Sequence, residues 1–100
     1  MLTNDEKKRF RAIGHQLKPV LQIGGKGLTE GVFEELNRAL EDHEIIKVKL
    51  AILDRDDRQA VVEELCQQSG AQLVQSVGKT VLLYRPAKKP NPRLSNLIRP

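Results

Sequence analysis

The chain has 100 residues, which is enough for one domain with an ordinary buried core. Its single cysteine, Cys66, excludes a disulfide within the chain, and no apolar run approaches the roughly 18 residues needed to cross a membrane. The N-terminal segment is charged and lacks the apolar run of a signal peptide, so we expect a cytoplasmic protein that acts as a monomer.

The net charge of +4 is distributed unevenly along the chain. Residues 1–29 carry +4, residues 30–64 carry −6 and residues 65–100 carry +6. This polarity predicts a basic surface that meets an anionic partner and an acidic surface turned away from it. The alternative is that the charges intermix once the chain folds.

The first predicted helix spans residues 3–18. Thr3 and Glu6 have the spacing of a capping box. An apolar stripe recurs at helical spacing, and a basic stripe runs beside it. The apolar stripe consists of Phe10, Ile13 and Leu17, and the basic stripe of Lys7, Arg11, His15 and Lys18.

Pro19 should end this helix, and residues 20–23 then form a strand that leads into a glycine-rich loop. A second helix follows over about residues 29–42. Residues 44–53 alternate as a strand, with Ile46 and Val48 on one face and Lys47 and Lys49 on the other.

The third helix should begin with Asp56 as its N-cap and end at Gly70. Residues 71–77 and 80–85 form two strands joined by the tight turn Gly78-Lys79. Residues 81–84 are apolar on both faces, so we expect this last strand to lie inside the sheet.

The predicted element order is αβαβαββ, an α/β (α+β) fold of two layers with a four-stranded mixed sheet. The second and third helices should share one face of the sheet, and the first helix should help to cover the other. We predict a domain over residues 1–86 and a flexible, basic, proline-containing tail over residues 87–100. A short docked turn that includes Leu94, Leu97 and Ile98 is the alternative for the tail.

The loop between the first strand and the second helix is typical of a phosphate-binding element. Gly24, Gly25 and Gly27 remove Cβ atoms that would hold a ligand away, Lys26 adds a charge, and the helix after Leu28 contributes unpaired N–H groups. A GxxG loop of this kind grips the RNA backbone in KH domains. A simple turn and a dinucleotide site are the alternatives, and the chain is too short for the second.

Other motifs offer little chemistry. The Gly78-Lys79-Thr80 segment lacks the first glycine of a phosphate-binding P-loop, because position 73 is leucine. The sequence contains no histidine or cysteine cluster with metal-ligand spacing and no nucleophile beside a base, so we expect neither an enzyme nor a cofactor. Aromatic residues are scarce, which disfavours base stacking of the kind that RRM and OB folds use.

The chain resembles the bacterial single-domain members of the CRM family, the chloroplast RNA splicing and ribosome maturation domain. The resemblance covers residues 2–86. It is carried by five blocks in the same order: Leu2-Thr3, Leu17-Lys18-Pro19-Val20, Gln22-Ile23-Gly24-Gly25-Lys26-Gly27-Leu28-Thr29, His43-Glu44-Ile45-Ile46-Lys47-Val48 and Leu83-Tyr84-Arg85-Pro86. In the family's loop a lysine commonly follows the first glycine, whereas here Lys26 stands one place later.

The resemblance implies a fold like the C-terminal domain of bacterial initiation factor three. It also implies binding to RNA of the large ribosomal subunit or its precursor particle, without a membrane or a small-molecule substrate. Plant members with several domains act in intron splicing, so a lone domain favours the ribosomal role. A protein-docking adaptor that uses the acidic second and third helices is the rival. The expected RNA-binding residues are Gly24, Gly25, Lys26, Gly27, Leu28, Lys7, Arg11, Lys18, Lys47 and Lys49.

Overall fold

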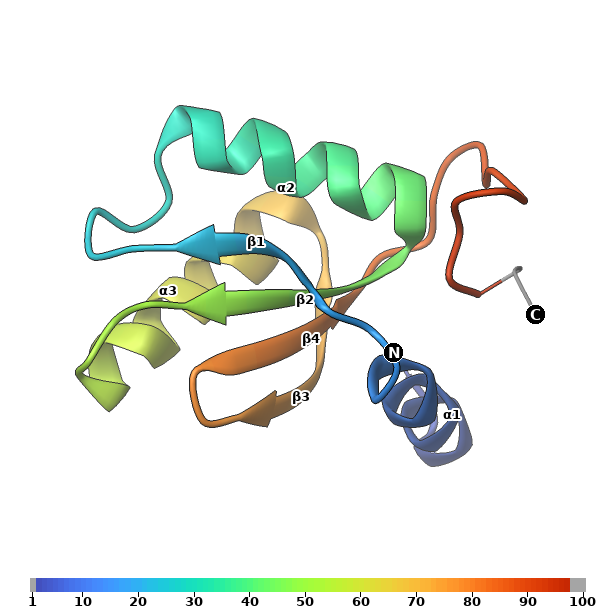
Figure 1. Cartoon of the computed structure of the whole chain (residues 1–100), viewed down its shortest axis with the longest axis horizontal. Coiled ribbons are helices and arrows are strands. Elements are labelled where there is room, and N and C mark those ends of the chain that lie inside the picture. The colour runs from blue at the N-terminus through green and yellow to red at the C-terminus, as the bar shows by residue number, and fades with distance from the viewer. Residues whose placement is uncertain (1, 98–100) are drawn as a thin grey trace.

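The computed structural model describes residues 2–97 and shows a four-stranded sheet with helices on both faces (Figure 1). In chain order the elements are α1 (Asn4–Gly14), β1 (Pro19–Ile23), α2 (Glu30–His43), β2 (Ile45–Leu50), α3 (Arg55–Ser69), β3 (Gln72–Val77) and β4 (Thr80–Tyr84). This is the αβαβαββ order that the sequence predicts. No helix in the described part of the chain is long and apolar enough to span a membrane.

The sheet is mixed, with the strand order β1-β2-β4-β3. β1 and β2 run parallel, and β4 pairs antiparallel with β2 on one side and β3 on the other. β4 therefore lies inside the sheet, as its apolar sequence predicts. Its central residues Val81, Leu82 and Leu83 are at most 2% exposed.

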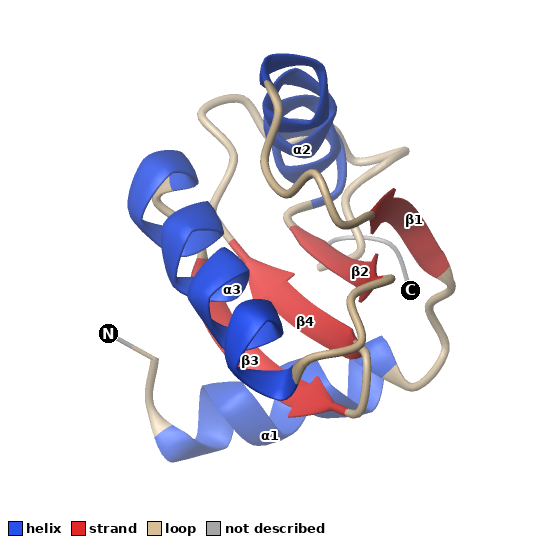
Figure 2. Cartoon of the chain, turned by 90° about the vertical axis from the view of Figure 1, so that its left-hand side faces the viewer, coloured by secondary structure: helices blue, strands red, loops and turns tan. Residues whose placement is uncertain are grey.

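Each face of the sheet has its own apolar cluster, and the larger cluster lies under α2 and α3 (Figure 2). Leu36 and Leu40 of α2 and Leu65 of α3 are fully buried there. On the other face, Phe10 of α1 packs with Leu82 in a smaller cluster. The expected arrangement is confirmed: α2 and α3 share one face, and α1 covers part of the opposite face.

Helix α1 is shorter than predicted, because it ends at Gly14 and not at residue 18. Beyond Gly14 the backbone tightens, since the N–H of Gln16 donates to the Ile13 carbonyl and the N–H of Leu17 to the Gly14 carbonyl. Gly14 is buried, and a Cβ atom there would lie 2.6 Å from Cδ2 of Leu82. The glycine lets α1 approach the sheet closely. The capping box of Thr3 and Glu6 is confirmed.

Two other boundaries differ from the prediction. The N-cap of α3 is Asp54 and not Asp56, because Oδ1 of Asp54 accepts hydrogen bonds from the N–H groups of Asp56 and Asp57. Strand β2 ends at Leu50 and not at residue 53, and Leu53 is 88% exposed. Gly70 ends α3 in a left-handed conformation, as predicted.

The C-terminal segment, residues 86–97, packs beside the end of α2 (Figure 1). Composition favours a flexible tail here, but the buried carboxylate of Glu44 accepts hydrogen bonds from the Ala87 N–H and the Ser95 hydroxyl. The side-chain amide of Asn96 donates to the Ile45 carbonyl, and Leu97 packs on the smaller cluster. The contact of Leu97 agrees with the alternative prediction of a short docked turn. Ile98, which that prediction also includes, lies outside the described residues. The boundary at residue 86 stays a prediction.

Candidate nucleic-acid interface

The glycine loop, residues 24–28, lies at the edge of the sheet where the parallel strands β1 and β2 both end. Just beyond that edge, the N–H of Ala51 donates to the Ile23 carbonyl over 2.7 Å. The β3–β4 hairpin reaches the same edge, because the N–H of Leu50 donates to the Lys79 carbonyl. Helices α2 and α3 begin there as well. The carboxyl edge of parallel strands is where open α/β sheets usually bind ligands.

The loop is a tight turn with open space around its backbone. The N–H of Gly27 donates to the Gly24 carbonyl over 3.0 Å, which closes the turn. Gly27 has a φ of +71°, which favours glycine. A Cβ atom at Gly24 or Gly25 would meet nothing within 4 Å. The backbone of the turn is therefore accessible to a ligand.

Unused backbone donors gather where the loop meets α2. Thr29 is the N-cap, and its hydroxyl accepts a hydrogen bond from the N–H of Val32. Within residues 2–97, no hydrogen bond uses the N–H groups of Gly25, Lys26 or Leu28. Together with the positive end of the α2 macrodipole and the exposed Lys26, these groups can hold a phosphate. The N–H of Gly27 is already used inside the turn.

Two predicted lysines, Lys47 and Lys49, lie on the face of β2 that α1 covers only in part. They alternate with Ile46 and Val48, which are buried in the larger cluster on the other face. Lys49 lies opposite Gln22, two residues before the loop, and Lys47 lies opposite Pro19. The exposed Lys18 directly precedes Pro19. The structure thus brings Lys18, Lys47 and Lys49 together along the first two strands and close to the loop.

Lys7 and Arg11 lie further away. Both are half-buried residues of α1. Figure 1 shows α1 at one end of the molecule and the glycine loop at the other. The ten predicted residues therefore divide into a group at the loop and along β1 and β2, and a separate pair on α1.

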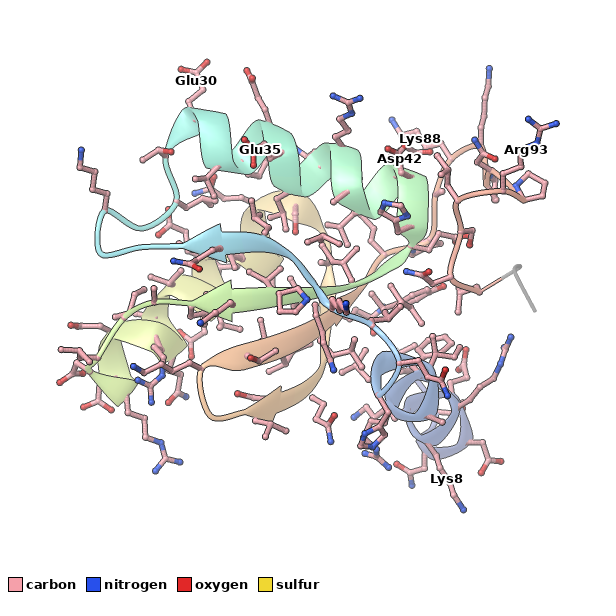
Figure 3. The ribbon with its side chains drawn as sticks, in the orientation of Figure 1. Lys8, Glu30, Glu35, Asp42, Lys88 and Arg93 are labelled. Carbon is pink, nitrogen blue, oxygen red and sulfur yellow. The ribbon has the colours of Figure 1, made fainter. Side chains whose placement is uncertain are left out.

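The acidic side chains of α2 lie on the side of the molecule away from α1, and Glu30 stands at the loop end of the helix. Glu30, Glu35 and Asp42 project from α2 on the side of the molecule opposite Lys8 of α1 (Figure 3). Lys88 and Arg93 of the C-terminal segment lie near the end of α2 (Figure 3). The separation of basic and acidic surfaces stays a prediction, and the C-terminal basic residues Lys88 and Arg93 lie beside acidic α2.

Shifted pKa values occur away from the loop. Burial raises the pKa of the Cys66 thiol, which makes it less nucleophilic at neutral pH and agrees with a structural cysteine. Burial and then the charge of Glu44 raise the pKa of Tyr84. The hydrogen bond that the Thr3 N–H donates to the Glu6 carboxylate lowers the pKa of Glu6. Within residues 2–97, no group of three or more His, Cys, Asp or Glu side chains could hold a metal ion.

Sequence reasoning missed two charged residues that organise the domain. Arg85 donates from Nη1 to Oδ1 of Asn37 and to the carbonyl of Ser69, and so ties the middle of α2 to the end of α3. Glu44 is buried, has a φ of +63° and anchors the C-terminal segment. Both lie in sequence blocks that carry the family resemblance, but no periodic pattern distinguishes them.

An α/β sheet with helices on both faces and an open glycine loop before α2 is typical of a domain that binds phosphate groups. The family model described as CRS1 / YhbY (CRM) domain matches residues 2–85, and the chain belongs to this family. It is 60% identical over 98 residues to a Pseudomonas aeruginosa protein named "Probable RNA-binding protein", covering 98% of this chain and 94% of that protein.

Two further relatives agree with this membership. The chain is 40% identical over 88 residues to a Haemophilus influenzae protein named "RNA-binding protein", which covers 88% of this chain and 89% of the relative. The solution structure of a hypothetical protein from Staphylococcus aureus matches with a TM-score of 0.77 and 32% identity, over 89% of this chain and 93% of the other. The predicted family and fold are therefore confirmed.

Proposed function

We propose that this protein binds RNA through its glycine loop and assists assembly of the large ribosomal subunit in the cytoplasm. Membership of the CRM family and the names of the bacterial relatives support RNA as the partner. The observation that carries the loop assignment is the open turn at Gly24–Gly27, with unused N–H groups beside the N-terminus of α2. The ribosomal role rests on the family resemblance.

The binding mechanism is electrostatic and does not require a reaction. Gly24 and Gly25 let the RNA backbone approach, the N–H groups of Gly25 and Leu28 donate to phosphate oxygens, and Lys26 neutralises charge. Lys18, Lys47 and Lys49 extend the contact along the sheet, and Lys7 and Arg11 contribute only if the RNA also reaches α1. Such contacts fix the register of the RNA but do not read bases. The protein acts here as a binding module without catalysis.

The test compares wild type with the double variant Lys26→Glu/Gly27→Asp. We expect the variant to lose binding to large-subunit ribosomal RNA while it remains folded, because the side chain at Gly27, where φ is +71°, should cost only about 1 kcal/mol of unfolding free energy. About five phosphate contacts should give a log–log salt slope of roughly −3 to −4 for the wild type. Crosslinking with sequencing in cells shows whether the bound RNA is ribosomal.

The matched control is Lys8→Glu, which reverses one charge on an exposed position of α1 away from the loop (Figure 3). It should bind RNA nearly as well as the wild type. Equal RNA binding by the double variant and by Lys8→Glu would overturn the loop assignment. If the double variant also keeps its association with ribosomal particles, the partner is a protein that docks on the acidic side chains of α2.

A further inference from the structure

The open part of the sheet face beside α1 contains a hollow of about 170 Å³. Its lining comes from the residue that follows α1 and from three strands. The lining residues are His15, Lys47, Gln75, Val77, Thr80 and Leu82. The proposed phosphate contacts do not use five of these six residues, and the sequence patterns gave no reason to group them.

The hollow exists because α1 ends early. Gly14 touches Leu82, and the chain then turns away, so the sheet beyond this point has no helix above it. Leu82 is only 2% exposed and forms the buried floor, whereas Val77 is 63% exposed at the rim. A register shift between Leu73 and Gln75 in β3 sets Gln75 opposite Leu82. The hollow therefore has a buried apolar floor and a rim that combines Val77 with polar side chains.

We propose that this hollow holds one unstacked base of a single-stranded RNA, a proposal that rests on the proposed RNA-binding function. Leu82 at the floor and Val77 at the rim suit the flat apolar faces of a base. Gln75 and Thr80 can each donate and accept hydrogen bonds, as the polar edge of a base requires. Protein pockets for whole ligands measure roughly 300–1,000 Å³, so the smaller volume here suits one ring system without its sugar and phosphate.

The charges around the hollow favour a nucleotide over a neutral ring compound. No acidic residue lines it, and Lys47 provides an ammonium group at its side. Lys49 lies opposite Thr80 in β4 and opposite Gln22 in β1, so it stands between the hollow and the glycine loop. A strand held at the loop by its phosphates can therefore follow Lys49 and Lys47 and place a base beside His15.

This arrangement gives the domain a way to distinguish bases despite its few aromatic residues. Bases in a duplex are stacked and paired, so they cannot enter such a hollow without being extruded. The protein should consequently prefer single strands, loops or bulges over continuous duplex. The carboxamide of Gln75 and the hydroxyl of Thr80 would set the preference among bases.

The test uses strands of about ten nucleotides, a length within the usual range for single-strand sites. One strand is oligoadenylate, one is oligouridylate, and the third is an abasic strand with the same backbone charge. We expect wild type to bind the better of the two base-bearing strands roughly tenfold more tightly than the abasic strand. The variants Gln75→Leu and His15→Ala should lose most of this difference and keep their affinity for the abasic strand.

The control variant is Gln67→Leu, the same chemical change at an exposed position of α3 on the other side of the sheet. It should behave as wild type with all three strands. If wild type binds the base-bearing and abasic strands equally, or if Gln75→Leu and His15→Ala keep the full difference, the base hollow is overturned. The proposed RNA binding by the glycine loop would still be supported, provided that Lys26→Glu/Gly27→Asp weakens binding of every strand. Strand binding that does not respond to the loop variant, or no strand binding at all, contradicts the proposed function itself.

Discussion

A backbone with a positive φ lies near each end of α2, and the two ends accommodate it in different ways. The helix begins after the glycine loop and ends at Glu44, with the loop and the C-terminal segment on opposite sides of the molecule (Figure 1). A residue with a positive φ lies near each end: Gly27 with a φ of +71°, and Glu44 with a φ of +63°. Only the first is the glycine that this conformation favours.

At the loop end, packing does little to fix the backbone. A Cβ atom at Gly27 would meet only Val61, at 4.0 Å, and Cβ atoms at Gly24 and Gly25 would meet nothing within 4 Å. The turn is closed by its own hydrogen bonds and stays open to solvent. Space that the fold leaves empty is available to a partner.

At the other end, the surroundings fix an unfavourable conformation. Glu44 is 5% exposed, and its N–H donates to the Leu40 carbonyl. Its carboxylate accepts from Ala87 and Ser95, and its carbonyl accepts from the N–H of Arg85. A strained residue persists when several contacts require it. The comparison indicates that the C-terminal end of α2 serves stability, and it agrees with the proposal that the N-terminal end serves binding.

The largest expected effect is that of Glu44→Ala. This change removes two hydrogen bonds to a buried carboxylate, leaves the Ser95 hydroxyl without its acceptor and keeps the strain of a positive φ. We expect a loss of about 3 kcal/mol in the free energy of unfolding, measured by urea denaturation. Glu44→Gly loses the same hydrogen bonds but relieves the strain, so it should be less destabilising than alanine by about 1 kcal/mol.

Glu35→Ala on α2 is the control for this prediction. Glu35 is exposed, so its removal should change stability by no more than about 0.5 kcal/mol. If Glu44→Ala is as mild as Glu35→Ala, the buried carboxylate does not hold the C-terminal segment, and the contrast between the two ends of α2 disappears.

A smaller effect is expected within the glycine loop. Gly27→Ala places a Cβ atom on a left-handed residue and should cost about 1 kcal/mol of unfolding free energy. Gly25→Ala has open space and no positive φ, so it should stay within about 0.5 kcal/mol of wild type. Equal losses for the two variants, measured by thermal unfolding, would show that the turn conformation does not distinguish these positions.

The features of the fold that could be predicted from the sequence are those that depend on hydrophobic periodicity and on turn and capping residues. The alternation of Ile46 and Val48 with Lys47 and Lys49 correctly predicted that both lysines lie on the face of β2 opposite the larger apolar cluster. The glycines marked the loop, and Thr3 with Glu6 marked the start of α1. These features are local, because each depends on residues that lie within a few positions of one another.

The sequence could not predict what depends on distant contacts. The apolar stripe that runs to Leu17 favours a helix through that residue, but the close packing of Gly14 on Leu82 ends it earlier. Among Asp54, Asp56 and Asp57, any could cap a helix, and the backbone direction after β2 selects the first. The hollow joins His15 to Gln75 across 60 positions of the chain, so no motif reports it.

The smallest effect concerns the response of the C-terminal segment to acid. Both carboxylate oxygens of Glu41 accept hydrogen bonds, one from the N–H of Lys88 and one from the N–H of Lys89, each over 3.2 Å. The bonds from Lys89 and Lys88 lower the pKa of Glu41. A lowered pKa means that the ionised carboxylate favours the docked state. This contribution is complete above the ordinary glutamate pKa and is lost as the pH falls through the lowered one.

Amide chemical shifts of Lys88 and Lys89, followed by NMR through an acid titration, measure this contribution. They should change with a midpoint below about pH 4.3, the ordinary value for glutamate. Glu41→Gln should abolish the titration of these two amides, since the amide side chain does not ionise. A midpoint at or above the ordinary value would show that the Glu41 carboxylate gains nothing from the segment. The hydrogen bonds of Glu44 and Asn96 would then hold residues 87–97 in place without a contribution from Glu41.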